Sequence, residues 1–329
     1  MASIPLTARA EAHPHLRALN ILRDLPAVAD LIELCFSNTM DSEGQRYVQD
    51  MRRAGRDDSF LRWATKMTET TSLPLTGYIW EENGKIVGNA SLVPFRRKNE
   101  RIYLIANVAT HPEFRRRGIA RALTERALQH SDERKVSATW LHVREDNPGA
   151  IKLYSDLGFV ERARRTSWQA RGDQAATSPQ SDTTITTRTA RDWPQQQDWL
   201  RRLYPDALAW YHPWNFSALQ PGLWNWLYLA FVDMNVRQWS ALTKAGQQLE
   251  AALAWIPSGR ETNSLWLAAG SGSRPDAVTS LLIHARRILF GHPRLTLDYP
   301  AGETDEAIRA AGFTALRTLI WMEHAGATS

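Results

Sequence analysis

Three consecutive arginines, Arg115 to Arg117, stand directly before Gly118 in the middle of the chain. An apolar run, Tyr103 to Ala109, precedes them and an amphipathic segment, Ile119 to His130, follows, so the pattern predicts a strand, a loop and the start of a helix. The first N–H groups of a helix have no partner within it, and together with the helix dipole they favour an anion. The loop is therefore a candidate phosphate-binding site.

A second motif, residues 147–159, follows the apolar run Ala138 to Val143. Asn147 suits the N-cap of a helix and Pro148 its first position, and Gly158 suits a C-terminal stop just after Leu157. Asn147 and Tyr154 are two helical turns apart, so their side chains project from nearly the same face. One ligand could therefore contact both.

The pattern R-x-x-G-x-A from Arg115 and the pattern N-P-x-A-I-x-L-Y-x-x-L-G-F from Asn147 together resemble the acyl-CoA-binding core of the GNAT acetyltransferase superfamily. The resemblance covers about Leu75 to Val160 and extends back toward His15. It implies an α/β (α+β) fold with a mixed, mostly antiparallel central sheet flanked by helices. It also implies an acetyl-CoA-dependent N-acetyltransferase, which moves an acetyl group to a primary amine by direct attack.

The resemblance implies roles for single residues. The backbone N–H groups of residues 115–120 would hold the CoA pyrophosphate, and the Val108 N–H would donate to the thioester oxygen. Tyr154 would be the general acid for the leaving thiolate, and Asn147 would contact the pantetheine. Helix capping alone would also explain Asn147, and core packing alone would explain Tyr154. The implied cofactor-binding residues are Val108, Ala109, Thr110, Arg115, Arg116, Arg117, Gly118, Ile119, Ala120, Asn147 and Tyr154.

The sequence does not identify the general base. Family members often carry a carboxylate on the central strand, but Ile102 to Thr110 contains no Asp or Glu. His142 on the adjacent strand has a suitable ordinary pKa, although a lone histidine between apolar neighbours is more often structural. Weaker candidates are Glu81, Glu82 and Glu145, and water could also relay the proton.

The composition limits the remaining function classes. The net charge of +5 is modest and spread along the chain, so the arginine groups fit solvated surface and attraction of an anionic cofactor better than nucleic-acid binding. The single cysteine, Cys35, is expected to be a buried helix residue and excludes an intrachain disulfide, and the scattered histidines predict no metal site. Since no apolar run approaches a membrane span and no signal peptide is evident, we expect a cytoplasmic monomer or homodimer without a membrane partner.

At 329 residues the chain favours two domains. We expect a flexible N-terminus over 1–14, a catalytic domain over 15–170, a polar linker over 171–184 and a second domain over 185–329. Within the first domain the patterns predict helices over 24–36 and 47–53, a hairpin of 77–80 and 86–93 about Asn83-Gly84, strands over 102–110, 138–143 and 160–170, and helices from 119 and from 148.

The second half repeats the order of the first in degraded form. Setting Gly312-Phe313 over Gly158-Phe159 places Ile308 at the Tyr154 position and Ala301 at the Asn147 position. The loop from Gly270 to Arg274 keeps glycines but not the arginine pattern. We therefore expect a tandem fold whose C-terminal domain has lost cofactor binding.

The acceptor, a small-molecule or peptide amine, cannot be read from the sequence. Specificity is expected in Ser37 to Thr71 and in the tryptophan-rich stretch Trp193 to Trp239, whose aromatics serve either packing or an acceptor pocket. Two other functions stay open: a catalytically silent acyl-CoA-binding sensor, and an aminoacyl transferase on the same duplicated fold.

Overall fold

A computed structural model describes most of the chain, which divides into two compact units. Unit 1 comprises Met1–Val143, Pro148–Glu161 and Met322–Ser329, and unit 2 comprises Arg144–Asn147 and Arg162–Trp321. The residues that the structure describes are 13–40, 42–56, 76–97, 100–171, 182–212, 214, 216–222, 224, 227, 231, 235–243, 248–256, 263–292 and 294–326.

The sheet of unit 1 has the strand order β1-β2-β3-β4-β5. The pairs β1–β2, β2–β3 and β3–β4 are antiparallel, whereas β4 and β5 are parallel. Left-handed backbone at Asn83 (φ 51°) and Gly84 (φ 75°) turns β2 into β3, which confirms the predicted hairpin. The strands are β1 (Leu16–Ala18), β2 (Thr76–Glu82), β3 (Lys85–Arg97), β4 (Glu100–Thr110) and β5 (Ala138–Arg144).

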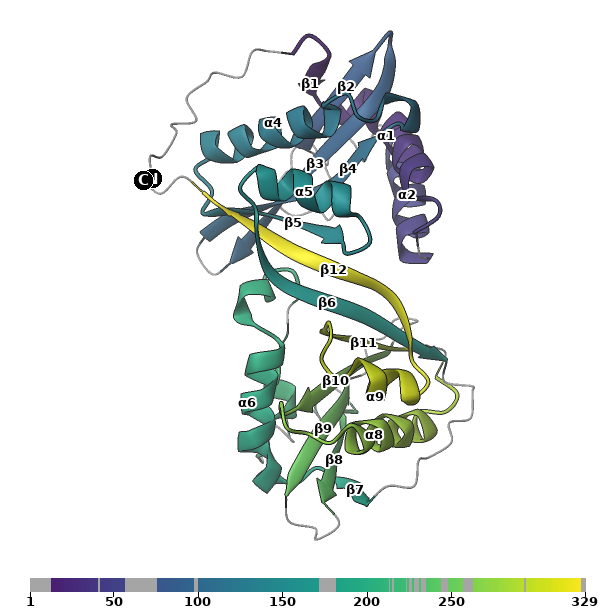
Figure 1. The fold of residues 1–329 in the computed structure, drawn as a ribbon, viewed down its shortest axis with the longest axis vertical. Coiled ribbons are helices and arrows are strands. Elements are labelled where there is room, and N and C mark those ends of the chain that lie inside the picture. Colours follow the sequence, from purple (N-terminus) through teal and green to yellow (C-terminus); the bar gives the residue numbers. More distant parts are fainter. Residues whose placement is uncertain are drawn as a thin grey trace. The chain divides into compact units, whose positions relative to one another are not determined.

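Helices cover both faces of this sheet (Figure 1). The apolar sides of α1 and α2, among them Leu25, Val28 and Met51, form one buried cluster with Ile79 of β2. On the other face α4 lies so close to β3 that a Cβ at Gly88 would be 2.6 Å from Ile119 Cγ2. The predicted mixed sheet flanked by helices is confirmed. The helices are α1 (Ile21–Phe36), α2 (Ser42–Ala54), α4 (Ile119–Glu133) and α5 (Pro148–Asp156).

The end of α5 is fixed by a Schellman motif. Gly158 has a φ of 86°, and its N–H donates to the Ser155 carbonyl at 3.0 Å. The Phe159 N–H donates to the Tyr154 carbonyl at 3.0 Å. Gly158 thus ends the helix as predicted and holds the backbone of Tyr154.

Unit 2 repeats the topology of unit 1, because its strand order β7-β8-β9-β10-β11 matches β1-β2-β3-β4-β5. Again the last two neighbours, β10 and β11, are parallel and the others antiparallel. The duplicated fold is confirmed. The strands are β6 (Val160–Arg171), β7 (Thr183–Thr187), β8 (Arg237–Thr243), β9 (Leu249–Ile256), β10 (Asn263–Ala269), β11 (Arg294–Pro300) and β12 (Thr314–Ala325), and the helices are α6 (Trp193–Leu203), α8 (Pro275–Ile288) and α9 (Asp305–Ala310).

Each unit is completed by a strand from the other half of the sequence. Strand β6 pairs antiparallel with β11, from Arg165↔Pro300 to Arg171↔Arg294, so only Val160 and Glu161 of this strand belong to unit 1. The end of β12 belongs to unit 1, where the Gly326 N–H bonds the Ser137 carbonyl at 3.1 Å.

The predicted domain bounds stay predictions, and these units differ from them by this exchange of strands. Residues 1–12 of the expected flexible terminus and 172–181 of the expected linker lie outside the described residues. Strand β7 already begins at Thr183, inside the expected linker. No helix in the described part of the chain is long and apolar enough to cross a membrane.

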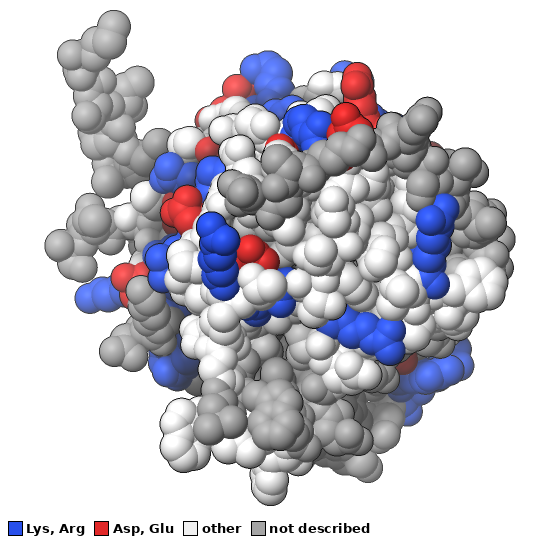
Figure 2. Space-filling view, turned by 90° about the horizontal axis from the view of Figure 1, so that it is seen from below, with Lys and Arg blue, Asp and Glu red and all other residues white. Residues whose placement is uncertain are grey.

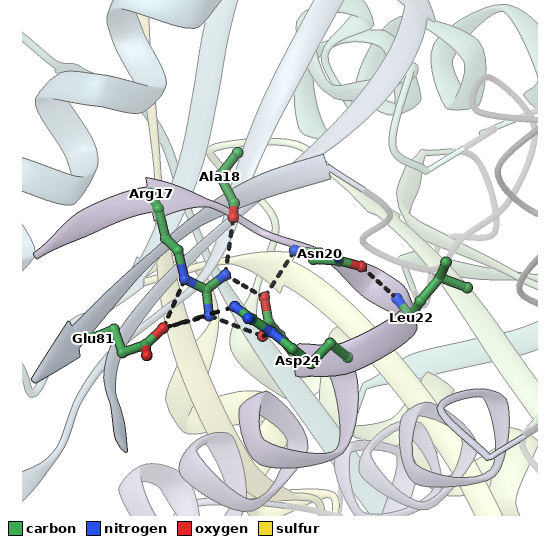
Figure 3. Close-up of polar contacts among 7 residues, drawn as sticks. Arg17, Ala18, Asn20, Leu22, Asp24 and Glu81 are labelled. Atoms are coloured by element: carbon green, nitrogen blue, oxygen red, sulfur yellow. Dashed lines mark hydrogen bonds and ion pairs between the residues drawn. The ribbon is translucent and has the colours of Figure 1, made fainter. Parts of the chain in front are cut away.

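An ionic network around the buried Asp24 joins β1, α1 and β2 (Figure 3). The Asp24 carboxylate is 2% exposed and accepts hydrogen bonds from Arg17 at 2.6 and 2.9 Å and from the Asn20 N–H at 2.8 Å. Arg17 also donates to Glu81 at 2.7 Å. Burial alone would raise the pKa of Asp24, but the hydrogen bonds from Arg17, Asn20 and Arg23 outweigh burial and lower it.

We expect Asp24→Asn to lower the free energy of unfolding by about 2–3 kcal/mol at neutral pH, because it leaves Arg17 without its buried partner. A lowered pKa stabilises the fold above the ordinary pKa of the carboxyl and loses this effect as pH falls through the folded-state value. The difference from the wild type should therefore shrink below about pH 4. Urea unfolding at several pH values measures it.

Asp50→Asn is the matched control, since Asp50 is exposed and lies 3.6 Å from Arg53. Its loss should stay below about 0.5 kcal/mol. Equal losses in the two variants would contradict the structural role of Asp24.

Candidate active site

The arginine-rich loop ends in a helix start that has no internal cap. A 3-10 turn, Pro112–Phe114, leads into it, and left-handed backbone at Arg116 (φ 65°) and Gly118 (φ 80°) turns the chain into α4. The Ala122 N–H makes a 3.0 Å hydrogen bond to the Gly118 carbonyl, while no side chain of the described residues caps the helix. The N–H groups of Ile119 and Ala120 precede that bond, so the helix itself gives them no partner.

The arginine side chains of this loop lie on the surface. Arg115, Arg116 and Arg117 are all exposed. Arg117 lies over the Phe114 ring at 4.8 Å and 3.7 Å from Glu82, and Arg115 Nε donates to the Thr110 carbonyl at 3.4 Å. Arg115 and Arg117 thus already have contacts within unit 1, and all three guanidinium groups are open to solvent.

Beside this loop, β4 and β5 diverge. Their register runs from Ile102↔Ala138 to Ile105↔Leu141. Beyond it β4 continues to Thr110 and β5 to Arg144, but no residue of one strand pairs with a residue of the other. All of these residues are described. Parallel strands that part leave backbone groups available to an extended ligand, which could add to the edge of β4.

A β-bulge interrupts the other edge of β4. The β3–β4 register pairs Asn89↔Ala109 and then Ser91↔Ala106, so Asn107 and Val108 together face the single residue Ala90. Asn107 has a φ of 53°, the left-handed conformation that asparagine tolerates better than most residues. The sequence reasoning missed this bulge, although an asparagine within an apolar strand was its signal.

Tyr154 lies in α5, which contacts the first turn of α4 just after the arginine-rich loop, because Arg121 of α4 and Asp156 of α5 form an ion pair at 3.4 Å. Its side chain is 7% exposed, and burial raises its pKa to about 12. The hydroxyl makes no hydrogen bond to any residue that the structure describes. A protonated phenol is thus available as an acid at every ordinary pH. Asn147 is exposed directly before α5.

The candidate bases are dispersed. His142 is half-buried on β5, one residue past the last pair with β4. Glu81 is bonded to Arg17, Glu82 accepts from Trp80 Nε1 at 3.1 Å, and Glu145 is bonded to Arg164 at 2.5 Å. Each of these three carboxylates therefore already has a hydrogen-bond partner.

The cysteine and two further histidines contact other residues of the fold. Cys35 was expected to be buried but is only half-buried, and its thiol, whose pKa burial raises, donates to the Thr110 carbonyl at 3.3 Å. The His13 ring lies 4.2 Å from that of Trp80, and His212 stacks on Trp214 at 5.6 Å. The described residues contain no group of three or more His, Cys, Asp or Glu that could hold a metal ion.

A cavity of about 570 Å³ lies between α1, the β2–β3 turn and His111. Its lining includes Arg17, Glu81 and Lys85 but none of the residues expected to bind an acyl donor. On the face shown in Figure 2, Lys and Arg side chains stand apart from one another and form no continuous basic patch.

In unit 2 side chains of the protein itself accept hydrogen bonds from the backbone N–H groups of the corresponding loop. Ser273 Oγ accepts from the Gly270 N–H at 2.8 Å, and the Glu250 carboxylate accepts from the Arg274 N–H at 3.1 Å, where α8 begins. Strands β10 and β11 also diverge after Leu265↔Leu297. An internal carboxylate thus stands at the helix start that would attract a phosphate.

Backbone carbonyls of the diverging strands in unit 2 are bonded by side chains. The Tyr204 hydroxyl donates to the Leu267 carbonyl at 3.2 Å, and Arg202 donates to the Ala269 carbonyl at 3.0 Å. On β11, Arg165 donates to the Asp298 carbonyl at 3.0 Å. The rings of Trp214, Phe216 and Trp266 each lie 5.4 Å from that of Tyr204.

Comparison with known proteins agrees with this geometry. Residues 28–159 match the acetyltransferase (GNAT) family. The chain is 40% identical over 62 residues to the ribosomal protein bS18-alanine N-acetyltransferase of Escherichia coli, a match that covers 19% of this chain and 42% of that protein. It is 30% identical over 113 residues to an uncharacterized N-acetyltransferase of Methanocaldococcus jannaschii, covering 33% of this chain and 47% of that protein.

One solved structure extends the likeness to the whole chain. A GCN5-related N-acetyltransferase from Sphaerobacter thermophilus superposes with a TM-score of 0.54 and 14% identity, over 95% of this chain and 96% of that one. At this identity the likeness concerns the fold alone.

The left-handed backbone at Gly118 predicts that Gly118→Ala destabilises the protein by about 1 kcal/mol, because an L-residue is strained at this φ although its Cβ would meet open space. Gly272→Ala is the control: the Cβ there also meets open space, without a positive φ. Urea unfolding of both variants tests the difference. Equal stability would contradict the assigned loop geometry.

Proposed function

Because residues 28–159 belong to the acetyltransferase (GNAT) family, we propose that the chain is an N-acetyltransferase that moves the acetyl group of acetyl-CoA to a primary amine. One observation carries the proposal. An uncapped helix start at Gly118 lies at the end of the strand that diverges from β5, so one ligand can meet anion donors and a free strand edge in succession.

The residues fit a nucleotide thioester. The N–H groups at the start of α4 would hold its diphosphate, and Gly118 lets the backbone approach closely because nothing lies within 4 Å of its missing Cβ. The edge of β4 over 108–110 would pair with the pantetheine arm, and Asn147, directly before α5, would also contact the arm. Acetyl-CoA would supply the activated acetyl group.

Two groups would act on the reacting atoms. The Val108 N–H would stabilise negative charge on the carbonyl oxygen, and Tyr154 would give its proton to the departing thiolate. Because Glu81, Glu82 and Glu145 already bond other residues, we assign no general base, and His142 remains a weaker candidate. The amine would then bind in its neutral form or pass its proton to water.

For the acceptor, a peptide N-terminus is the first class to test, ahead of small-molecule amines. The support is the relative whose substrate is the alanine of a ribosomal protein, over a match of 62 residues. Much of the segment expected to select the acceptor, residues 57–71, lies outside the described residues.

The test is to incubate the protein with acetyl-CoA and a panel of peptide and small-molecule amines while free thiol is measured. Acceptor-dependent thiol release supports the transferase. Acetyl-CoA binding without turnover on any amine would support the silent sensor. Transfer of a labelled aminoacyl group to an amine when charged tRNA replaces acetyl-CoA would support an aminoacyl transferase.

Tyr154→Phe should lower kcat by about 10²-fold, since it removes the proton donor but keeps the ring. The affinity for CoA should change little. Tyr78→Phe is the control, because its hydroxyl bonds His130 at 2.9 Å, on a different segment of α4 from the anion-binding start. Steady-state kinetics and calorimetric CoA titration separate the two effects, and unchanged kcat in Tyr154→Phe would remove this residue from the mechanism.

We also propose that unit 2 no longer binds CoA. In support, Glu250 and Ser273 occupy backbone donors at the α8 loop, and Ile308 stands where unit 1 has Tyr154. A phosphate would have to displace a carboxylate there.

Calorimetric titration should accordingly give one CoA per chain. Gly118→Val, which adds a branched side chain at the open helix start, should weaken this binding by at least about tenfold. Ser273→Ala, at the corresponding loop of unit 2, should leave stoichiometry and affinity unchanged. A stoichiometry of two, or a loss of binding in Ser273→Ala, would contradict the assignment of the site to unit 1.

A further inference from the structure

A buried polar network underlies the β4 bulge and has no role in the chemistry described so far. Asn89 and Ser91 of β3 are both 0% exposed. Asn89 Nδ2 donates to the Asn107 carbonyl at 2.9 Å and to Ser91 Oγ at 3.1 Å. The side-chain amide of Asn107 (Nδ2) donates in turn to the Tyr47 hydroxyl of α2 at 2.8 Å. The bulge is thus held from β3 and from α2.

We propose that Asn89 is a positioning residue that aims the Val108 N–H at the acetyl carbonyl. In a planar trans peptide the carbonyl of one residue and the N–H of the next point in opposite directions. Asn89 holds the Asn107 carbonyl on the β3 side, so the Val108 N–H is directed away from β3. Strand β5 is the neighbour of β4 on that other side.

The direction matters because β4 and β5 have already parted there. The last pair between them is Ile105↔Leu141, and Val108 lies three residues further along β4. The N–H therefore faces the opening between the strands, where the proposed thioester lies. A donor fixed in advance toward developing charge stabilises it more than one that must first reorient.

The backbone at Asn107 needs this support. Its φ of 53° is a conformation that an L-residue leaves readily for extended backbone, which would rotate the following peptide. The Asn89 hydrogen bond opposes that rotation through the carbonyl. The Tyr47 hydrogen bond opposes it through the side chain.

Asn89 is costly for the fold, which favours a functional reason for its presence. Its Oδ1 is buried and has no hydrogen-bond partner among the described residues. A buried acceptor without a partner destabilises a protein, so packing alone would favour an apolar side chain of this size. Among the described residues, the Asn89 amide donates to the Asn107 carbonyl of the bulge and to Ser91 Oγ.

The inference rests on the proposed acetyl transfer, and the test uses the full chain. Asn89→Leu keeps the volume but removes the donor, and Asn107→Val disfavours the left-handed backbone by a different route. Ser91→Ala is the control, because it removes the other acceptor of the same amide and leaves the Asn107 carbonyl bonded. Each protein is mixed with acetyl-CoA labelled with ¹³C at the carbonyl, and the infrared band of that carbonyl is recorded alongside kcat, KM and the melting temperature.

In the wild type and in Ser91→Ala the bound carbonyl band should lie at lower wavenumber than in free acetyl-CoA. In Asn89→Leu and Asn107→Val it should return toward the free position, with kcat reduced about 10- to 10²-fold and KM for acetyl-CoA little changed. Affinity for CoA, which has no acetyl carbonyl, should be unaffected.

The outcomes distinguish the role of Asn89 from the proposed acetyl transfer. A wild type that binds and transfers, with the band and kcat unchanged in either folded variant, would overturn the role of Asn89 and leave the transferase intact. Loss of melting temperature without a band shift would likewise assign Asn89 to structure alone. A wild type that does not bind acetyl-CoA would overturn the proposed function and this inference with it.

Discussion

The parting of β4 from β5 is the constraint on which the rest of unit 1 depends. Two parallel strands normally satisfy each other's backbone groups, and after Ile105↔Leu141 they no longer do so. Where two neighbouring strands separate, the space between them is filled either by side chains or by solvent and ligand. In unit 1 the neighbouring features favour a ligand: an uncapped helix start follows β4, and a bulge interrupts β4 beside the opening.

Unit 2 shows the other solution to the same constraint. Its strands diverge after Leu265↔Leu297, but Tyr204, Arg202 and Arg165 bond the carbonyls beyond that point. Aromatic rings surround Tyr204, and Glu250 caps the loop before α8. The same topology can thus hold a cofactor or a packed interior, depending on which side chains reach the opening. The tryptophan-rich sequence of this half is therefore explained at least in part by packing.

The features that the sequence predicted are the local ones. Gly118, Pro148 and Gly158 act through backbone geometry within a few residues, so their types alone indicated where α4 and α5 begin or end. Pairing between distant strands leaves no such signal in the sequence. The side chains of β6 alternate between the two faces of a sheet whichever unit the strand joins, so the sequence did not predict that most of β6 belongs to unit 2 and the end of β12 to unit 1. Asn89 was also missed, because its role depends on a carbonyl 18 residues away in sequence. The only sign of this role in the sequence of β3 is that polar residues, Asn89 and Ser91, stand among apolar ones.

The raised pKa of Tyr154 decides how this residue would act. With a value of about 12 against a thiol near 8.5, complete proton transfer to a solvated thiolate is uphill by about 5 kcal/mol. A thiolate leaving into the same apolar surroundings is itself poorly solvated, so its own pKa rises and the difference narrows. Transfer would therefore follow bond cleavage, and until then the hydroxyl would stabilise the departing sulfur by a hydrogen bond. The absence of a hydrogen-bond partner for this hydroxyl among the described residues fits such a donor, because no protein acceptor competes for its proton.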